Sequence, residues 1–204
     1  MTVLGVRFDL KITLVIILGT LLPLVDRYGH TVFSVRAYDR FLYYFVVPAV
    51  VIVVIFRERL QDYGFRWGNW KEGLAWTVAG CAAMAVVLSV VARRPEMIAY
   101  YQLKSASGFW REVWESGIDL FAWEFIWRGF MLFALARVTG PGLAIWLQAV
   151  PFTFAHLGKP EIETMSCIFG GAGFGLVAWR TRSFVYPFII HTFITSWTTW
   201  LAMV

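Results

Sequence analysis

Three groups of ionisable residues lie inside strongly apolar stretches of the chain. Glu124 and Arg128 are four residues apart, His156 follows an aromatic run, and His191 lies in a later apolar stretch. Burying an ionisable group at membrane depth costs roughly 3 kcal/mol on insertion scales, so each is a candidate functional residue. A Glu with two His is sufficient for peptide hydrolysis, because a carboxylate can deprotonate water while imidazoles orient it or donate to an oxyanion. The same side chains could also hold a metal.

Each of these residues also has a purely structural interpretation. Glu124 and Arg128 share one helix face at i and i+4, where they can form an intramembrane ion pair that positions helices. A single histidine among apolar residues is more often a hydrogen-bonded core group than a catalyst. Their occurrence together favours one buried polar site.

These residues must be positioned by membrane-spanning helices. The chain of 204 residues is 59% hydrophobic and 18% aromatic, with a mean hydropathy of +0.66, which exceeds the values of ordinary soluble domains. Because a helix needs roughly 20 apolar residues to cross the hydrocarbon core, we expect an all-α fold, a polytopic transmembrane helical bundle of about seven spans. The expected spans are residues 10–25, 41–56, 73–92, 118–136, 142–157, 163–179 and 184–204.

The chain is expected to form one integral membrane domain over residues 1–204. The first three spans carry no ionisable residue in their centres, so we expect residues 1–116 to be a scaffold and residues 117–204 a catalytic half. The net charge of +5 comes from basic residues in the connections, as expected beside anionic lipid. We expect the lipid bilayer as a partner and no nucleic acid, since no soluble basic module is present.

Two further expectations concern aromatic residues. Residues 109–119 mix charged and aromatic side chains, which is typical of an amphipathic helix at the membrane interface. The aromatic residues around the first motif are expected either to line a groove for an apolar substrate helix or to face lipid. They are Phe121, Trp123, Phe125, Trp127 and Phe130.

Three motifs in this order resemble those of the CPBP intramembrane proteases, also called the Abi or CAAX protease and bacteriocin-processing family. The family pattern is Glu-Glu-x-x-x-Arg, then Phe-x-x-x-His, then His-x-x-x-Asn or a variant. In this chain the motifs read Trp123-Glu124 to Arg128, Phe152 to His156, and His191 to Thr195. The similarity covers residues 118–199.

The resemblance implies an intramembrane endopeptidase that hydrolyses a peptide bond through Glu-activated water. Glu124 would be the general base, held by Arg128. His156 would orient or share the water, while His191 and Thr195 would stabilise the oxyanion. The catalytic type stays open between glutamic and metal-dependent. If a divalent metal such as zinc is present, His156, His191 and Glu124 would be its ligands.

The resemblance also implies a class of substrate and a location. The substrate would be a membrane protein, or a lipidated or C-terminal-helix peptide: a prenylated CAAX-type tail, a bacteriocin leader or a C-terminal sorting helix. A compact chain without extra domains is similar to bacterial members, so we expect an integral protein of the bacterial inner (plasma) membrane.

Two residues depart from the family pattern. Trp123 replaces the first Glu, which is the position assigned the catalytic role in CAAX endopeptidases, and adjacent helix residues point about 100° apart. Thr195 replaces the common Asn, although its hydroxyl can still donate one hydrogen bond. We expect Glu124 to serve in place of the missing Glu. The alternative is a non-catalytic CPBP-like membrane scaffold or bacteriocin-immunity-type protein.

Overall fold

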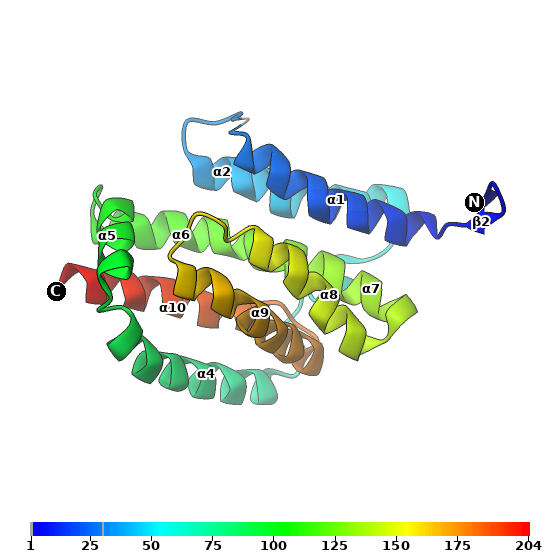
Figure 1. The fold of residues 1–204 in the computed structure, drawn as a ribbon. Coiled ribbons are helices and arrows are strands. Elements are labelled where there is room, and N and C mark those ends of the chain that lie inside the picture. Colours follow the sequence, from blue (N-terminus) through cyan, green and yellow to red (C-terminus); the bar gives the residue numbers. More distant parts are fainter. Residues whose placement is uncertain (1, 30) are drawn as a thin grey trace.

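The protein is a bundle of helices, and the structure is a computed structural model that describes residues 2–29 and 31–204 (Figure 1). A two-residue hairpin, β1 and β2, precedes the first helix and pairs antiparallel. The elements are β1 (Thr2–Val3), β2 (Val6–Arg7), α1 (Leu10–Arg27), α2 (Arg36–Phe41), η1 (Leu42–Val46), α3 (Val47–Val50), η2 (Val51–Phe56), η3 (Leu60–Tyr63), α4 (Trp70–Val91), α5 (Pro95–Lys104), α6 (Phe109–Glu124), η4 (Phe125–Met131), α7 (Leu132–Thr139), α8 (Pro141–Phe154), α9 (Glu161–Thr181) and α10 (Val185–Met203). The all-α fold class is confirmed.

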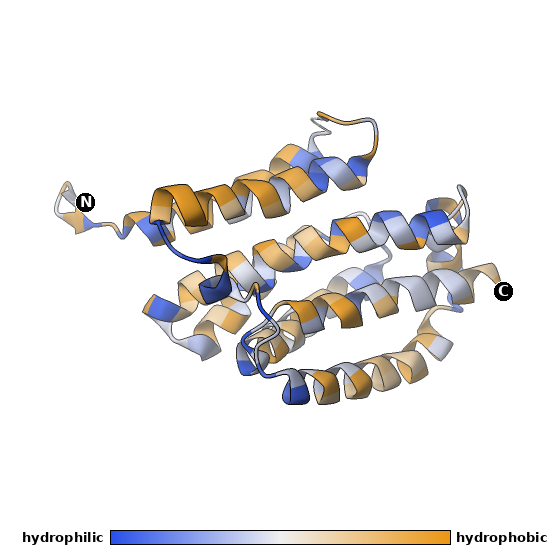
Figure 2. Ribbon diagram, turned by 180° about the vertical axis from the view of Figure 1, so that it is seen from behind, coloured by the Kyte–Doolittle hydropathy of each residue, from blue (hydrophilic) through white to orange (hydrophobic). Residues whose placement is uncertain are grey.

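A helix coincides with every expected span. Three helices, Arg36–Phe56, Trp70–Val91 and Glu161–Thr181, are long and apolar enough to cross a membrane, and the apolar helix Pro141–Phe154 is shorter. Apolar residues cover the lengths of the helices, while the strongly hydrophilic residues gather mainly near helix ends and connections (Figure 2). The chain is therefore an integral membrane protein, and the number of seven spans stays a prediction.

The helices form layers around α6 and α10. In Figure 1, α1 and α2 lie together on one side of α6, whereas α4 lies on the opposite side of the bundle, beyond α10. The helix pairs α8 with α9, α4 with α10, and α6 with α10 make extensive contacts. Within α4 only Gly73 and Leu88 are buried, so this helix is an outer wall.

The helix that carries the first motif is continuous from Phe109 to Thr139 and changes its winding inside the motif. Residues Phe125–Met131 form a π-helix, in which the backbone hydrogen bonds run from i to i+5. This segment begins directly after Glu124 and includes Arg128. Such π segments occur frequently at functional sites.

A polar cluster ties the N-terminal helices to α6. Arg40 lies between two carboxylates, with Nε 3.0 Å from Asp26 Oδ2 and Nη1 2.6 Å from Asp119 Oδ2. Arg36 also contacts Asp26, and the Tyr44 hydroxyl donates to Asp26 Oδ2 at 3.0 Å. These contacts bring α1, α2 and the π-helix η1 against α6.

A second cluster lies at the opposite end of α1. Glu58 accepts hydrogen bonds from Lys11 at 2.5 Å, Tyr63 at 2.6 Å and Arg137 at 2.6 Å. The Glu58 carboxylate therefore joins α1, the connection before α4, and α7.

Four of the five aromatic residues around the first motif lie in the bundle interior and face neither lipid nor a groove. These four are Trp123, Phe125, Trp127 and Phe130.

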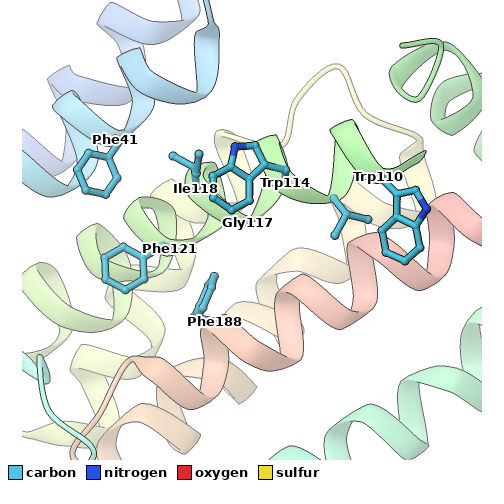
Figure 3. A pocket seen from close by; sticks show the side chains of 8 residues that line it. Phe41, Trp110, Trp114, Gly117, Ile118, Phe121 and Phe188 are labelled. Carbon is cyan, nitrogen blue, oxygen red and sulfur yellow. The ribbon is translucent and has the colours of Figure 1, made fainter. Parts of the chain in front are cut away.

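The expected amphipathic segment is the first part of α6, and its tryptophans are exposed: Trp110 by 80% and Trp114 by 67%. Together with Phe41, Phe121 and Phe188, they line an open apolar groove of about 520 Å³ between α2, α6 and α10 (Figure 3). The groove therefore contains one of the five expected aromatic residues, Phe121.

Candidate active site

The three motifs meet where α6, the end of α8 and α10 pack together. Glu124 ends α6, His156 lies in the turn after α8, and His191 lies in the second turn of α10. The Glu124 and Arg128 side chains are completely buried, whereas His156 and His191 retain small exposed fractions of 2% and 7%. The fold therefore brings together residues that are up to 67 positions apart in the chain.

Glu124 contacts both Arg128 and His191. Its Oε1 lies 2.6 Å from His191 Nδ1 and accepts a long hydrogen bond, 3.4 Å, from Arg128 Nη1. Arg128 Nε lies 3.2 Å from Oε2, but this contact lacks hydrogen-bond geometry, and both atoms are buried without a hydrogen-bond partner in the described part of the chain. Charge attraction therefore holds the pair more than directional hydrogen bonding does.

Two aromatic rings and one carbonyl group complete the surroundings of Arg128. Its guanidinium lies 3.9 Å from the centre of the Phe152 ring and 5.2 Å from that of Phe174. Nη2 donates a long hydrogen bond to the Gly171 carbonyl, which also accepts from Gln148 Nε2 at 2.9 Å. Arg128 therefore joins the motif helix to α8 and α9.

The hydrogen bonds of the two histidines assign their neutral tautomers. His156 Nδ1 lies 2.8 Å from the Phe152 carbonyl oxygen, which can only accept, so Nδ1 carries the proton and Nε2 carries a lone pair. His191 Nδ1 donates to the Glu124 carboxylate in the same way. The two rings are nearly parallel, with centroids 6.5 Å apart, and each has Nε2 left for substrate or water.

The neighbouring residues Trp123 and Glu124 contact different histidines. The Trp123 ring meets His156 edge to face, with centroids 5.6 Å apart, whereas Glu124 contacts His191. Trp123 also packs against Tyr44 and Trp127. The position of the missing motif Glu is thus filled by an aromatic ring beside His156, which has no carboxylate partner among its hydrogen bonds in the described residues.

A cavity of about 650 Å³ opens beside the two histidines. His156, His191 and Thr195 line it, together with Phe152 of α8 and mostly apolar residues of α4, α5, α9 and α10. Thr195 lies one turn after His191 on the same face of α10 and is 6% exposed. Glu124 does not line this cavity, because His191 separates it from the cavity wall.

The site residues do not fit a metal centre in this arrangement. No group of three His, Cys, Asp or Glu side chains that could hold a metal occurs within residues 2–29 and 31–204. Glu124, the third expected ligand, is shared between His191 and Arg128 and does not line the cavity that the Nε2 atoms of the histidines can face.

The cavity wall contains a carboxylate, Glu163, that the sequence motifs did not indicate. Glu163 lines the cavity and pairs with Lys159 at 2.7 Å. The Tyr101 hydroxyl on α5 donates to Glu163 Oε2 at 2.9 Å. The i, i+4 spacing of Lys159 and Glu163 was a visible signal, but Glu163 was treated only as the start of a span.

Comparison with known proteins agrees with this site. Residues 116–197, which contain all the motif residues, match the family model described as type II CAAX prenyl endopeptidase Rce1-like. This segment of the chain is therefore similar to the Rce1-like family. The matched family is a protease family, and the match supports the CPBP resemblance of the motifs. No curated protein and no solved structure matches the chain.

Proposed function

We propose that this Rce1-like protein is an intramembrane endopeptidase that hydrolyses a peptide bond of a membrane-associated protein. The observation that carries the proposal is that His156, His191 and Thr195 line one cavity, with Glu124 held against His191 at 2.6 Å. A mostly apolar cavity in a membrane protein suits an apolar substrate segment. The substrates that we propose are lipidated tails and C-terminal membrane helices.

The geometry argues for a division of roles that differs from the motif-based expectation. Glu124 is completely buried and does not line the cavity, so it is badly placed to deprotonate a cavity water. His156 lines the cavity and has a lone pair on Nε2. We therefore propose His156 as the general base and Glu124 as the residue that positions His191.

The oxyanion would be stabilised from α10. When His191 is protonated, the Glu124 carboxylate neutralises the imidazolium, and Nε2–H is a charged donor. The Thr195 hydroxyl lies one turn further on the same helix face and can add a second donor. Two donors directed at one developing oxyanion are the usual source of the largest catalytic term in acyl transfer.

The proposed reaction is a direct attack by water and needs no covalent intermediate with the enzyme. Water attacks the carbonyl carbon of the scissile bond while His156 Nε2 takes the proton of the water. The tetrahedral intermediate carries its negative charge toward His191 and Thr195. The C–N bond then breaks, and His156 returns the proton to the leaving amine. The bacterial plasma membrane is the location that we propose for this reaction.

Comparison of protein termini in host membranes tests this proposal. Cells would express wild type, His156→Gln, Thr195→Val or Thr192→Val at matched levels, and mass spectrometry would identify new termini. Thr192 is a matched control because it lies on α10 outside the cavity lining. We expect products that are present with wild type and Thr192→Val, absent with His156→Gln, and reduced roughly tenfold or more with Thr195→Val, since a lost oxyanion donor lowers kcat.

The non-catalytic scaffold is the competing hypothesis, and Trp123 beside His156 is the observation behind it. It predicts that membranes with wild type and with His156→Gln contain the same termini. That result, obtained with both proteins inserted and folded, would rule out the peptidase proposal.

A further inference from the structure

Glu163 carries the only carboxylate among the described residues that line the cavity. It lies in the first turn of α9, and 18% of its side chain is exposed. The other cavity residues are mostly apolar, so the field of a carboxylate is weakly screened there. A substrate segment in this cavity therefore meets one acidic group besides the two histidines.

Both oxygens of Glu163 keep capacity for a substrate. Oε1 receives the Lys159 ammonium at 2.7 Å, and Oε2 receives the Tyr101 hydroxyl at 2.9 Å. Each carboxylate oxygen has two lone pairs, so each has one acceptor position left. Glu163 and Tyr101 both line the cavity, so a donor in the substrate can reach the acceptor positions of Glu163.

Lys159 compensates the charge of Glu163. Burial disfavours the ammonium ion, but the Glu163 carboxylate outweighs this effect and raises the pKa of Lys159, so the lysine stays charged. Lys159 is not part of the cavity lining, whereas Glu163 is. The pair is thus neutral overall and presents its acidic side to the cavity.

The pair belongs to the segment that holds His156. The Lys159 backbone N–H donates to the His156 carbonyl oxygen at 3.1 Å, and the Thr164 hydroxyl donates to the same oxygen at 3.0 Å. The proposed base and the Lys159–Glu163 pair are therefore parts of one hydrogen-bonded turn. A substrate segment bound at His156 therefore also faces the cavity wall that carries Glu163.

We propose that Glu163 is a specificity-determining residue, which accepts a hydrogen bond from an uncharged or basic donor of the substrate near the scissile bond and rejects an acidic side chain there. This inference rests on the proposed peptidase function. Like charges at close range in a desolvated site are strongly disfavoured. Lys159 limits the preference for basic residues, because it neutralises the pair.

A merely structural role for Glu163 makes a different prediction. Tyr101 belongs to α5, so its hydrogen bond to Glu163 also fastens α5 to α9. If this fastening were the only role, replacing Glu163 would lower stability and the amount of product. The residue preference around the cleaved bonds would not change.

The test compares cleavage-site sequences in host membranes that contain no added protein, wild type, Glu163→Gln, Lys159→Gln or Glu161→Gln. Glu161 is the matched control because it lies in the same first turn of α9, is exposed and does not line the cavity. The readout is the ratio of acidic to basic residues within six positions of each cleaved bond, measured from the new termini.

The two variants should shift this ratio in opposite directions. Glu163→Gln leaves the Lys159 charge uncompensated, so acidic residues should become about tenfold more frequent relative to basic ones, which corresponds to about 1.4 kcal/mol. Lys159→Gln leaves Glu163 uncompensated and should shift the ratio toward basic residues. Glu161→Gln should keep the wild-type ratio.

Unchanged ratios in Glu163→Gln and Lys159→Gln, with cleavage by wild type intact, would overturn the inference and leave the peptidase function standing. If wild type produced no termini beyond those of membranes without the protein, the proposed function itself would fail. If Glu163→Gln failed to fold, the Lys159→Gln ratio would decide alone, because its predicted direction is opposite.

Discussion

The buried pair of Glu124 and Arg128 predicts a distinctive result for three variants. Both side chains are completely buried, and Arg128 Nε lies 3.2 Å from Glu124 Oε2. Glu124→Gln leaves the guanidinium charge in the bundle interior, where its described polar contacts besides Glu124 amount to one long hydrogen bond. Arg128→Gln leaves the Glu124 carboxylate with His191 as its remaining partner. The double variant leaves neither charge.

The size of the effect follows from the distance. At 3.2 Å and an effective dielectric constant of about 20, the attraction is about 5 kcal/mol. Removing one partner of a buried ion pair costs about 3–5 kcal/mol, because the other charge stays buried without compensation. We therefore expect each single variant to lose about 3–5 kcal/mol, and the double variant to lose at least about 2 kcal/mol less than the sum of the two.

Thermal unfolding in detergent measures the contribution of the Glu124–Arg128 pair to stability, and the cleavage assay measures its contribution to activity. The double variant should unfold at a higher temperature than either single variant, yet it should not cleave, because a neutral amide cannot compensate a protonated His191. Glu115→Gln is the control, since it breaks the exposed i, i+4 pair with Arg111 and should change stability by less than about 0.5 kcal/mol. Additive losses in the double variant, or full cleavage by it, would refute this account.

Three further predictions concern Glu58, Gly68 and Trp123. Burial disfavours the Glu58 carboxylate, but three neighbouring donors outweigh this effect and lower the pKa of Glu58 to about 2, so ionised Glu58 stabilises the fold above about pH 5. The difference in Tm between wild type and Glu58→Gln should be full at pH 7 and shrink as the pH falls from 5 toward 2. A difference that is independent of pH would contradict this. Gly68→Ala should destabilise the protein by about 1–3 kcal/mol, since Gly68 has a φ of +56° and an added Cβ would overlap the Thr181 carbonyl. A denaturation curve with wild-type stability would show that the loop adapts. Trp123→Glu should not raise cleavage, because it removes ring packing beside His156; a large gain in the terminus comparison would instead mean that Trp123 blocks an otherwise complete site.

Hydropathy predicted the positions of the helices well. Each expected span coincides with a helix, because a long apolar run in lipid must satisfy its backbone hydrogen bonds internally. The end of the first span was less well predicted: it was expected at residue 25, but α1 continues through Pro23 to Arg27. Helix ends depend on local capping and on contacts with other helices, which composition does not specify.

The sequence identified the motif residues but not their geometry. Their spacing correctly indicated that Glu124 and Arg128 can pair, and the catalytic roles stay predictions. The π-helix after Glu124 has no simple sequence signal, and it changes which side chains share a face. That Trp123 meets His156 while Glu124 meets His191 depends on how α6 packs against α8 and α10.

The cavity was not predictable from local patterns. Its walls come from five helices that are distant in the chain, and Glu163 gains its significance only from lying in the same wall as His156 and His191. Sequence spacing shows that Lys159 and Glu163 can pair, but tertiary packing decides that the pair faces a cavity and meets Tyr101.

Incorporation of ¹⁸O by purified protein in liposomes tests directly whether this cavity hydrolyses peptide bonds. A substrate identified from the comparison of termini would be incubated in H₂¹⁸O with wild type or His156→Gln, and the mass of the new C-terminus would be measured. Wild type should release a product whose new carboxylate contains one ¹⁸O atom, and His156→Gln should form this product at least about 100-fold more slowly. Cleavage by His156→Gln at the wild-type rate, or no cleavage by folded wild-type protein, would contradict the claim that this cavity hydrolyses peptide bonds.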